Sequence, residues 1–231
     1  MNYDAWEKYY LEILSDFKFD RIMDEQASQL LSEKLRGMNT ISPGDLEKII
    51  MGKHAFIFGG GDLLFQGIET FMEFTRRGAE EIVTISADGV TTHLIKNNIL
   101  PDIIVTDLDG KIEDQVTANE KGSVVVVHAH GDNASNIKKW VSRFNGKLVG
   151  TTQARPLANI FNFGGFTDGD RCVFLAEHFG AKKITLVGFD YSRVGKTSNK
   201  KSTETKLKKL MWAKKLIETI CKETGIELEY L

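Results

Sequence analysis

The sequence carries no excess of charge of either sign, and it has no long apolar run. Its 30 basic and 32 acidic residues leave a net charge of −2, so no overall field attracts nucleic acid or an anionic membrane surface. Its apolar runs have the length of strands and fall well short of the ~20 residues that a membrane span needs. The first residues are too charged for a signal peptide. We therefore expect a soluble, cytoplasmic protein with no nucleic-acid partner and no membrane partner.

The sequence also has few cysteines. The two cysteines, Cys172 and Cys221, do not form a Cys-x-x-Cys pair. A disulfide framework is unexpected in a reducing compartment. We expect two buried thiols, each within a helix.

Two patterns divide the chain near residue 50. Residues 1–50 show helical apolar spacing and no convincing strand, which predicts a small helical N-terminal appendage. From residue 51 onward, strand-like runs alternate with amphipathic segments, which is typical of βαβ units. The expected strands are 54–58, 81–87, 102–106, 123–129, 147–151, 183–189 and 226–230. We predict an α/β catalytic domain over 51–231, with a mostly parallel sheet and helices on both faces.

Aspartates recur where the expected strands end. They are Asp88, Asp107, Asp109, Asp132 and Asp190. In a parallel sheet, the carboxyl ends of the strands lie on one edge, where ligands bind at a topological switch point. Carboxylates are costly to bring together unless a cation neutralises them, and oxygen ligands favour Mg²⁺, commonly beside substrate phosphates. The sequence therefore predicts metal-assisted chemistry on a phosphate-bearing ligand.

The sharpest part of this pattern is Asp107-Leu108-Asp109. In an extended segment, residues i and i+2 face the same side, so both carboxylates could chelate one metal or bridge two. An Asp-x-Asp pair also arises by chance among surface aspartates. Its place at a strand end, beside Asp88 and Asp132, favours a metal site.

His128 and His130 offer an alternative set of ligands on one strand face. Such a pair can hold zinc or iron, but no further clear histidine ligand accompanies it, because His178 fits a helix face. We expect the two histidines to contact the substrate or to support the ligands, with Asp132 as the oxygen ligand.

Two turns are candidates for binding phosphate or substrate. Gly60 and Gly61 lie between the first expected strand and its helix, where glycine permits close approach to an anion. Their spacing does not fit a dinucleotide fingerprint, and a purely structural turn is an equal alternative. The run Thr167 to Arg171 precedes an amphipathic helix. Either Thr167 or Asp168 simply caps that helix, or Asp168, Asp170 and Arg171 contact nucleotide or substrate.

A basic stretch at 191–201 follows the strand that ends near Asp190. Its Gly195-Lys196-Thr197 lacks the first glycine of a Walker A loop, because position 190 is aspartate. We expect a loop whose lysines reach a polyphosphate, since lysine is a compact and mobile positive charge. These lysines are Lys196, Lys200 and Lys201.

Several motifs follow one another in a recognisable order. They are Ala87-Asp88-Gly89 with Thr92, the run Pro101 to Asp109, His128 to Asn133, Thr167 to Arg171, and Gly188-Phe189-Asp190. Together they resemble the archaeal 6-hydroxymethyl-7,8-dihydropterin pyrophosphokinase family. That family is similar to the catalytic domain of thiamine pyrophosphokinase, which has Ala-Asp-Gly and Asp-x-Asp in the same order. The resemblance covers roughly 54–231 and implies an α/β fold, Mg²⁺ dependence, ATP as donor, and a role in tetrahydromethanopterin or folate biosynthesis.

The resemblance also implies roles for single residues. The pterin hydroxymethyl oxygen would attack the β-phosphorus of ATP and release AMP. Asp107, Asp109 and Asp132 would be the catalytic residues and would bind Mg²⁺. The residues that would contact ATP or the acceptor are Gly60, Gly61, Asp88, Asp168, Asp170, Arg171 and Asp190. ATP and a reduced pterin are thus the expected partners, and a homodimer is left open.

Two departures from the relatives bear on substrate choice. The relatives often carry Gly-x-Gly-Pro-Ser at the first turn, whereas this chain has Gly59-Gly60-Gly61-Asp62-Leu63. The chain also ends soon after its last helix, without the β-sandwich with which thiamine pyrophosphokinases complete their thiamine site. Thiamine is therefore the less favoured acceptor. The rival functions are a metal-dependent glycosyltransferase, which also uses Asp-x-Asp, and a module that senses nucleotide without turnover.

The Asp-x-Asp pair gives a direct prediction. Asp107→Asn and Asp109→Asn should each lower turnover by at least ~10²-fold with the fold intact, because a catalytic metal loses an anionic ligand. Removal of one of several like charges should leave the melting temperature without metal unchanged or higher. Steady-state kinetics and thermal melts measure both effects. Full activity in both variants would contradict the metal site.

Overall fold

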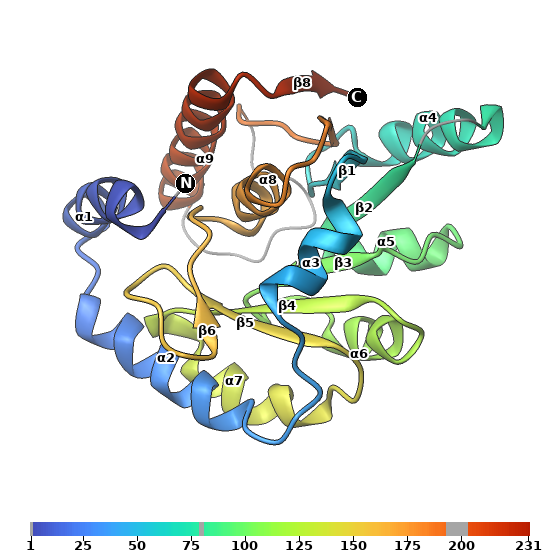
Figure 1. Ribbon diagram of the computed structural model, residues 1–231. Helices are drawn as coiled ribbons and strands as arrows, with labels where there is room; N and C mark the ends of the chain where they lie inside the picture. Colours follow the sequence, from blue (N-terminus) through green and yellow to red (C-terminus); the bar gives the residue numbers. More distant parts are fainter. Residues whose placement is uncertain (1, 79–80, 193–202) are drawn as a thin grey trace.

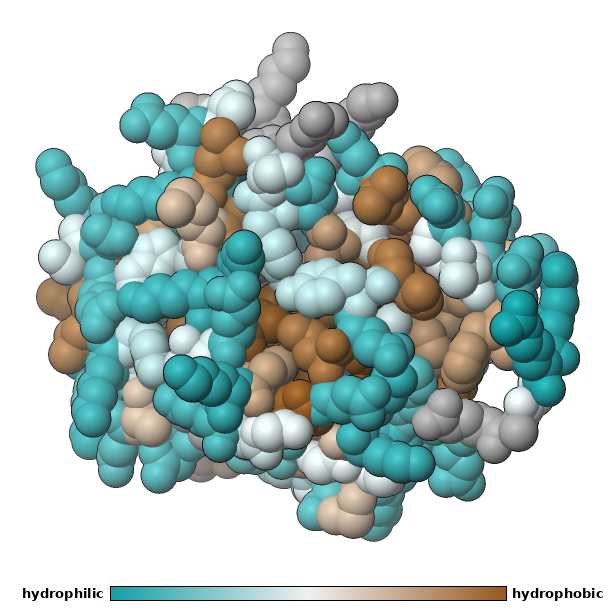
Figure 2. All heavy atoms as spheres, turned by 90° about the horizontal axis from the view of Figure 1, so that it is seen from above, coloured by the Kyte–Doolittle hydropathy of each residue, from teal (hydrophilic) through white to brown (hydrophobic). Residues whose placement is uncertain are grey.

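The computed structural model describes residues 2–78, 81–192 and 203–231 (Figure 1). The expected polyphosphate contacts of Lys196, Lys200 and Lys201 lie outside these residues. Seen from above, the described surface is largely hydrophilic, and hydrophobic residues gather in a hollow near its centre (Figure 2).

A single parallel sheet runs through the described part of the chain. Its order is β6-β5-β4-β3-β2-β1-β7-β8, and every neighbouring pair is parallel. The strands are β1 (His54–Phe58), β2 (Ile82–Ala87), β3 (Ile103–Thr106), β4 (Val124–Ala129), β5 (Leu148–Thr152), β6 (Ile160–Phe161), β7 (Lys183–Val187) and β8 (Glu227–Tyr230). All the expected strands are present. The addition is β6, whose two residues are too few to show a period.

The strand order creates a switch point between β1 and β7. From β1 the chain adds β2 to β6 successively on one side, and it then returns to place β7 on the other side. The helices that follow β1 and β7 therefore leave in different directions, and a crevice opens at the carboxyl ends of these two strands. This edge is where the sequence predicted the ligand.

Helices cover both faces of the sheet, as predicted (Figure 1). The helices are α1 (Tyr3–Phe17), α2 (Arg21–Lys34), α3 (Pro43–Ile50), α4 (Leu64–Arg77), α5 (Val90–Lys96), α6 (Ile112–Glu120), α7 (Ala134–Trp140), α8 (Asp168–His178) and α9 (Thr203–Thr224), with short 3-10 turns η1 (Gly131–Asn133) and η2 (Val141–Arg143). One face packs on α1, α3, α8 and α9. The other packs on α2 and α4 to α7. Alternating strand residues such as Val124 and Val125 enter the two cores in turn, as the two-residue period of a strand requires.

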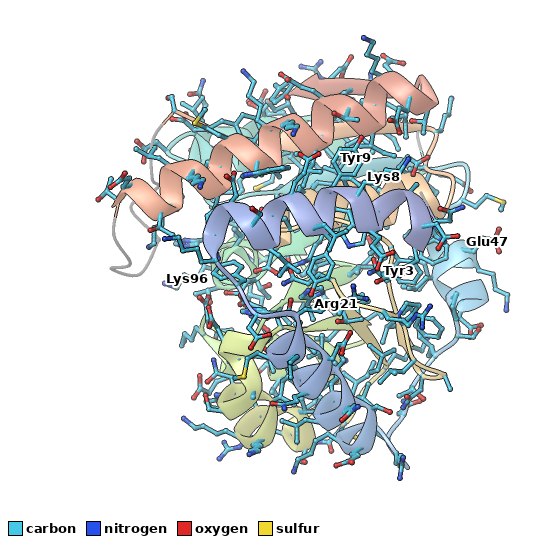
Figure 3. All side chains as sticks on the ribbon, turned by 90° about the vertical axis from the view of Figure 1, so that its left-hand side faces the viewer. Tyr3, Lys8, Tyr9, Arg21, Glu47 and Lys96 are labelled. Carbon is cyan, nitrogen blue, oxygen red and sulfur yellow. The ribbon has the colours of Figure 1, made fainter. Side chains whose placement is uncertain are left out.

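The N-terminal helices share these cores. Trp6 and Tyr10 of α1 are fully buried, and the Trp6 ring lies edge-on to Phe174 of α8 with 6.0 Å between centroids. Figure 3 shows α1 lying beside α9. Asp16 of α1 accepts a hydrogen bond of 2.8 Å from Trp212 Nε1 of α9. The division of the chain into two parts at residue 50 stays a prediction.

The two cysteines differ in burial. Cys172 is buried in α8, whereas Cys221 of α9 is only half-buried, and both thiols are free.

Within the described part of the chain, none of the helices has both the length and the apolar character needed to cross a bilayer.

A buried carboxylate in α2 joins segments that are distant in the sequence. Asp24 Oδ2 accepts hydrogen bonds of 2.8 Å from Tyr10 Oη of α1 and from Gln153 Nε2 after β5. Its Oδ1 accepts one of 2.7 Å from the backbone N–H of Gly131 in η1. The side chain of Asp24 is 4% exposed, so water does not replace these bonds. Asp24 therefore fixes α1 and α2 against the carboxyl edge of the sheet.

This network predicts a large effect on stability. Asp24→Ala should lower the free energy of unfolding by about 3 kcal/mol or more, because it leaves buried donors unsatisfied at about 1–3 kcal/mol each. Urea denaturation measures the change. Glu33→Ala, at an exposed position of the same helix, is the control and should change stability by less than about 0.5 kcal/mol. Equal effects in the two variants would contradict the structural role of Asp24.

Candidate active site

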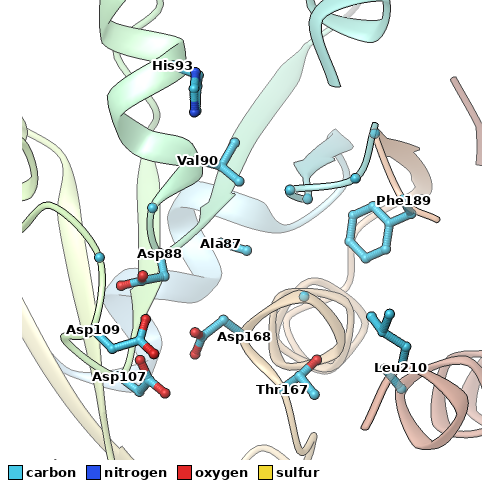
Figure 4. Close-up of a pocket in the computed structure, with 18 of the residues that line it drawn as sticks. Ala87, Asp88, Val90, His93, Asp107, Asp109, Thr167, Asp168, Phe189 and Leu210 are labelled. Atoms are coloured by element: carbon cyan, nitrogen blue, oxygen red, sulfur yellow. The ribbon is translucent and has the colours of Figure 1, made fainter. Parts of the chain in front are cut away.

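A cavity of about 960 Å³ opens at the carboxyl edge of the sheet, at the switch point (Figure 4). Its walls come from the turns after the strands: Gly59–Gly61 after β1, Asp88 after β2, Asp107 and Asp109 after β3, and Gly188–Tyr191 after β7. The N-terminus of α8 contributes Thr167, Asp168 and Gly169.

The floor of this cavity brings three of the predicted carboxylates together. Asp88, Asp107 and Asp109 each offer an oxygen atom, and these atoms lie within 4.8 Å of one another. Figure 4 shows Asp168 facing them from the start of α8. The three aspartates follow two neighbouring strands, so the parallel sheet itself places them side by side.

The two aspartates after β3 meet for a different reason from the one that the sequence suggested. The segment is not extended, because Leu108 has the left-handed φ of 66°. Its side chain is 1% exposed and packs in the core on the α2 side of the sheet, while its N–H donates to Thr106 Oγ1 at 2.9 Å. A branched residue in this region is strained by about 1–3 kcal/mol, which burial of the leucine offsets. The turn thus aims both carboxylates at the cavity.

Asp88 is held by residues that the sequence analysis did not identify. Its Oδ1 accepts hydrogen bonds of 2.5 Å from Thr106 Oγ1 and 2.9 Å from Gln115 Nε2, which leaves Oδ2 to face the cavity. A Cβ on Gly110 would overlap Asp88 Oδ2, so only glycine fits there. Thr106 has a weak signal in the sequence, because it stands next to the Asp-x-Asp pair, whereas Gln115, inside a helix, has none.

The pKa values of Asp88, Asp107 and Asp168 are shifted because these carboxyl groups are crowded and withdrawn from water. Burial and then the charge of Asp107 raise the pKa of Asp88 to about 7. Burial opposes ionisation of Asp107 too, but the hydrogen bond and the charge of His130 outweigh burial and lower the pKa of Asp107. Burial and then Asp107 raise the pKa of Asp168 well above its usual value. Near neutral pH the negative charge therefore lies more on Asp107 than on Asp88 or Asp168.

These residues fit a hard divalent cation. Asp107 Oδ1 is buried and has no hydrogen-bond partner in the described structure. An acceptor left without a donor is costly, and a cation would satisfy it. The donors are oxygens only, which suits Mg²⁺ better than zinc or iron.

Asp132 lies apart from this group. It is exposed on η1 and lines a smaller cavity of about 270 Å³, which adjoins the first at Asp107 and Asp168. Asp88 takes the place beside Asp107 and Asp109 that we expected for Asp132, whose role as a ligand stays a prediction. His130 Nε2 lies 3.2 Å from Asp107 Oδ2 and supports it, whereas the neighbouring His128 is buried beside Thr151.

The sequence left two roles open for the residues at the start of α8, namely capping the helix and contacting the ligand, and the structure shows residues of both kinds. Thr167 is the N-cap, and Asp170 Oδ1 accepts backbone hydrogen bonds from Phe166 and Thr167, so Asp170 caps the helix and lines neither cavity. Asp168 lines both cavities. Arg171 lines the smaller one and donates to Asp168 Oδ1 at 3.0 Å.

The remaining predicted contacts lie in the larger cavity. Asp190 lines it, and its Oδ1 accepts hydrogen bonds from the backbone and the hydroxyl of Ser192. Gly60 and Gly61 line it as well. The Gly61 N–H donates to the carbonyl of Gly188 at 2.7 Å, and a Cβ on Gly61 would overlap that oxygen. Gly61 therefore has at least a structural role, because it lets the turn after β1 pack on the turn after β7.

Comparison with known proteins places these motifs in a family. Residues 30–195 match the family model described as 6-hydroxymethylpterin diphosphokinase MptE-like. A protein of Methanocaldococcus jannaschii is 41% identical over the whole of both chains. One of Methanothermobacter thermautotrophicus is 38% identical over 99% of each, and one of Pyrococcus furiosus is 41% identical over 94% of each. All three are named 6-hydroxymethyl-7,8-dihydropterin pyrophosphokinase.

The raised pKa of Asp88 predicts how a cation affects stability. A folded-state pKa of about 7 lies above the unfolded value of ~3.9, so the contribution of Asp88 to stability is full below the unfolded value and is lost as pH rises through about 7. A cation binds the ionised form. The gain in melting temperature on adding Mg²⁺ should therefore be larger near pH ~8 than near pH ~5.

Thermal melts with and without Mg²⁺ at the two pH values test this expectation. Asp88→Asn should reduce the gain at the higher pH, whereas Asp62→Asn, at an exposed carboxylate, should leave it unchanged. A gain that is independent of pH, or equally small in both variants, would contradict the assignment of Asp88 to the cation.

Proposed function

The chain belongs to the MptE-like family of 6-hydroxymethylpterin diphosphokinases, and on this premise we propose that it transfers diphosphate from ATP to the hydroxymethyl oxygen of 6-hydroxymethyl-7,8-dihydropterin and releases AMP. As a member of this family it is an enzyme that transfers a diphosphate group. The proposal includes its Mg²⁺ dependence and a place in tetrahydromethanopterin or folate biosynthesis.

The observation that carries the proposal is the group of Asp88, Asp107 and Asp109 on the floor of the large cavity. Diphosphate transfer requires alignment and charge neutralisation more than covalent chemistry from the protein. When bound, Mg²⁺ would supply positive charge to the phosphate oxygens as AMP departs. The three carboxylates would hold that ion at the junction of the strand ends, and His130 would keep Asp107 ionised and oriented.

The large cavity suits ATP. Its volume of about 960 Å³ lies at the upper end of the range of about 300–1,000 Å³ typical of ligand pockets. Lys111, Lys206 and Lys209 line it and would lie near the phosphates. Thr167 to Gly169 begin α8 there, and the positive end of the helix dipole favours a negative ligand. Charge of both signs thus surrounds the place where the phosphates and their cation would meet.

The nature of the nucleotide product tests the reaction type. With the pterin, ATP and Mg²⁺, we expect AMP and a pterin diphosphate in equal amounts, because attack on the β-phosphorus leaves the α-phosphate on the nucleoside. EDTA should abolish the reaction and excess Mg²⁺ should restore it. Phosphorus NMR distinguishes AMP from the ADP that an ordinary kinase releases.

Two controls accompany this experiment. An Asp107→Asn protein, purified in the same way, shows whether a contaminating kinase forms the products. Thiamine, offered at the same concentration as the pterin, tests the acceptor. Formation of ADP would overturn the mechanism, and faster reaction with thiamine would overturn the substrate.

A further inference from the structure

We propose that the acceptor binds in the smaller cavity beside the carboxylate group, in a pocket that the N-terminal helices complete. This proposal deepens the proposed function and rests on it. The cavity holds about 270 Å³ and is lined chiefly by the turn between α1 and α2, by η1 and by the start of α8. Its occupant would be a small bicyclic heterocycle with ring and amino N–H donors, the class to which pterins belong.

The position of the cavity is the first argument. Transfer between two substrates requires that their reacting atoms meet beside the metal. The large and small cavities share a wall made of Asp107, Thr167, Asp168 and Lys209. Another cavity meets the large one at Phe189 to Tyr191, but none of the three clustered carboxylates lines it. The small cavity is therefore the neighbour from which an acceptor hydroxyl reaches a phosphate held beside Asp107.

The sizes of the two cavities give the second argument. A nucleoside triphosphate is much larger than a pterin, and the two cavities have volumes of about 960 and 270 Å³. The smaller value falls close to the lower end of the range of about 300–1,000 Å³ for ligand pockets, as expected for a bicyclic ring. ATP in the small cavity and the acceptor in the large one would reverse this match.

The lining chemistry gives the third argument. The pyrimidine ring of a pterin carries N–H donors beside a carbonyl acceptor. Asp132 and Asp168 present carboxylates to the small cavity, and Lys209 presents a cation. Phe19 and Phe166 supply an apolar wall, with Lys209 Nζ 5.7 and 5.4 Å from the centres of their rings. Apolar walls with a few fixed polar groups are typical of sites for small heterocycles.

The polar side of this cavity is fixed in advance by hydrogen bonds. Arg171 Nη2 donates to Gln153 Oε1 at 3.2 Å, and Gln153 Nε2 donates to Asp24 Oδ2 at 2.8 Å. Trp6 Nε1 of α1 donates to the Gln153 carbonyl at 2.8 Å. These side chains are almost completely buried, so they need little reorganisation when a ligand binds. The N-terminal helices thus have a role in function, because they build one wall of the acceptor site.

Two adjacent residues of α2 allow a matched test. Met23 and Ile22 are both exposed, at 47% and 60%, but only Met23 lines the small cavity. In Met23→Trp, the larger side chain fills part of that cavity. We expect the KM for the pterin to rise at least about tenfold, while the KM for ATP stays within a factor of about two. Ile22→Trp should leave both constants unchanged.

The kinetic outcomes separate the two proposals. If the parent enzyme forms pterin diphosphate but Met23→Trp has the pterin KM of Ile22→Trp, the acceptor binds elsewhere. If the KM for ATP rises instead, ATP occupies the small cavity. Both results overturn the acceptor site alone. If the parent enzyme forms no pterin diphosphate, the proposed function itself fails.

A second pair of variants tests binding without turnover and without a bulky substitution. Met23→Cys and Ile22→Cys are labelled with N-ethylmaleimide, and mass spectrometry follows the α2 peptide, so the half-buried Cys221 does not interfere. Bound pterin should slow labelling of Met23→Cys at least about fivefold, whereas AMP should not, because it occupies the other cavity. Labelling of Ile22→Cys should respond to neither. Protection of Met23→Cys by AMP alone, or by neither ligand while the parent turns over, would overturn the proposal.

Discussion

The repulsion between carboxylates at the strand ends is the constraint around which the active edge is built. Asp88, Asp107 and Asp109 approach one another closely enough to share an ion, and burial withdraws Asp88 and Asp107 from the water that would screen their charges. Specific contacts hold them in place, because like charges would otherwise separate. Hydrogen bonds from Thr106 and Gln115 fix Asp88, and the buried left-handed Leu108 fixes the turn that carries the other two. Backbone strain combined with buried hydrogen bonds is typical of functional sites rather than of structural ones.

Much of the fold could be predicted because β-branched runs and helical periods are local signals. The apolar runs place the strands near 54–58, 102–106 and 123–129 within a residue or two, and the aspartates after the last two of them mark the edge. The two-residue β6 could not be found, because so short a strand has no period of its own. The Asp-x-Asp pair was identified from the sequence, but the geometry assumed for it was wrong, since a left-handed leucine has no local signal.

The parts of the site that escaped prediction depend on contacts across long stretches of chain. Asp24 and Gln153 are 129 positions apart and become partners only because α2 packs near the end of β5. In sequence, Asp24 is one of three acidic residues in α2, and no local pattern distinguishes it from a solvated side chain. Asp170 shows the opposite case, because the cap that it completes follows from residues three positions apart. From the sequence, we offered Thr167 as a possible cap but expected Asp170 to contact nucleotide or substrate, because tertiary packing decides which charged residues reach the ligand.

The position of β1 in the sheet affects the order in which the parts of the active site can form during synthesis of the chain. β1 pairs with β2 on one side, but its other neighbour is β7, which begins at Lys183. During synthesis, β1 to β5 can pair as they emerge, and the turns with the three clustered carboxylates are then already in place. The crevice has only one wall until β7 docks beside β1. A nascent chain at that stage would carry the clustered carboxylates without one wall of the large cavity, so the cavity cannot be complete before the turn after β7 has been synthesised.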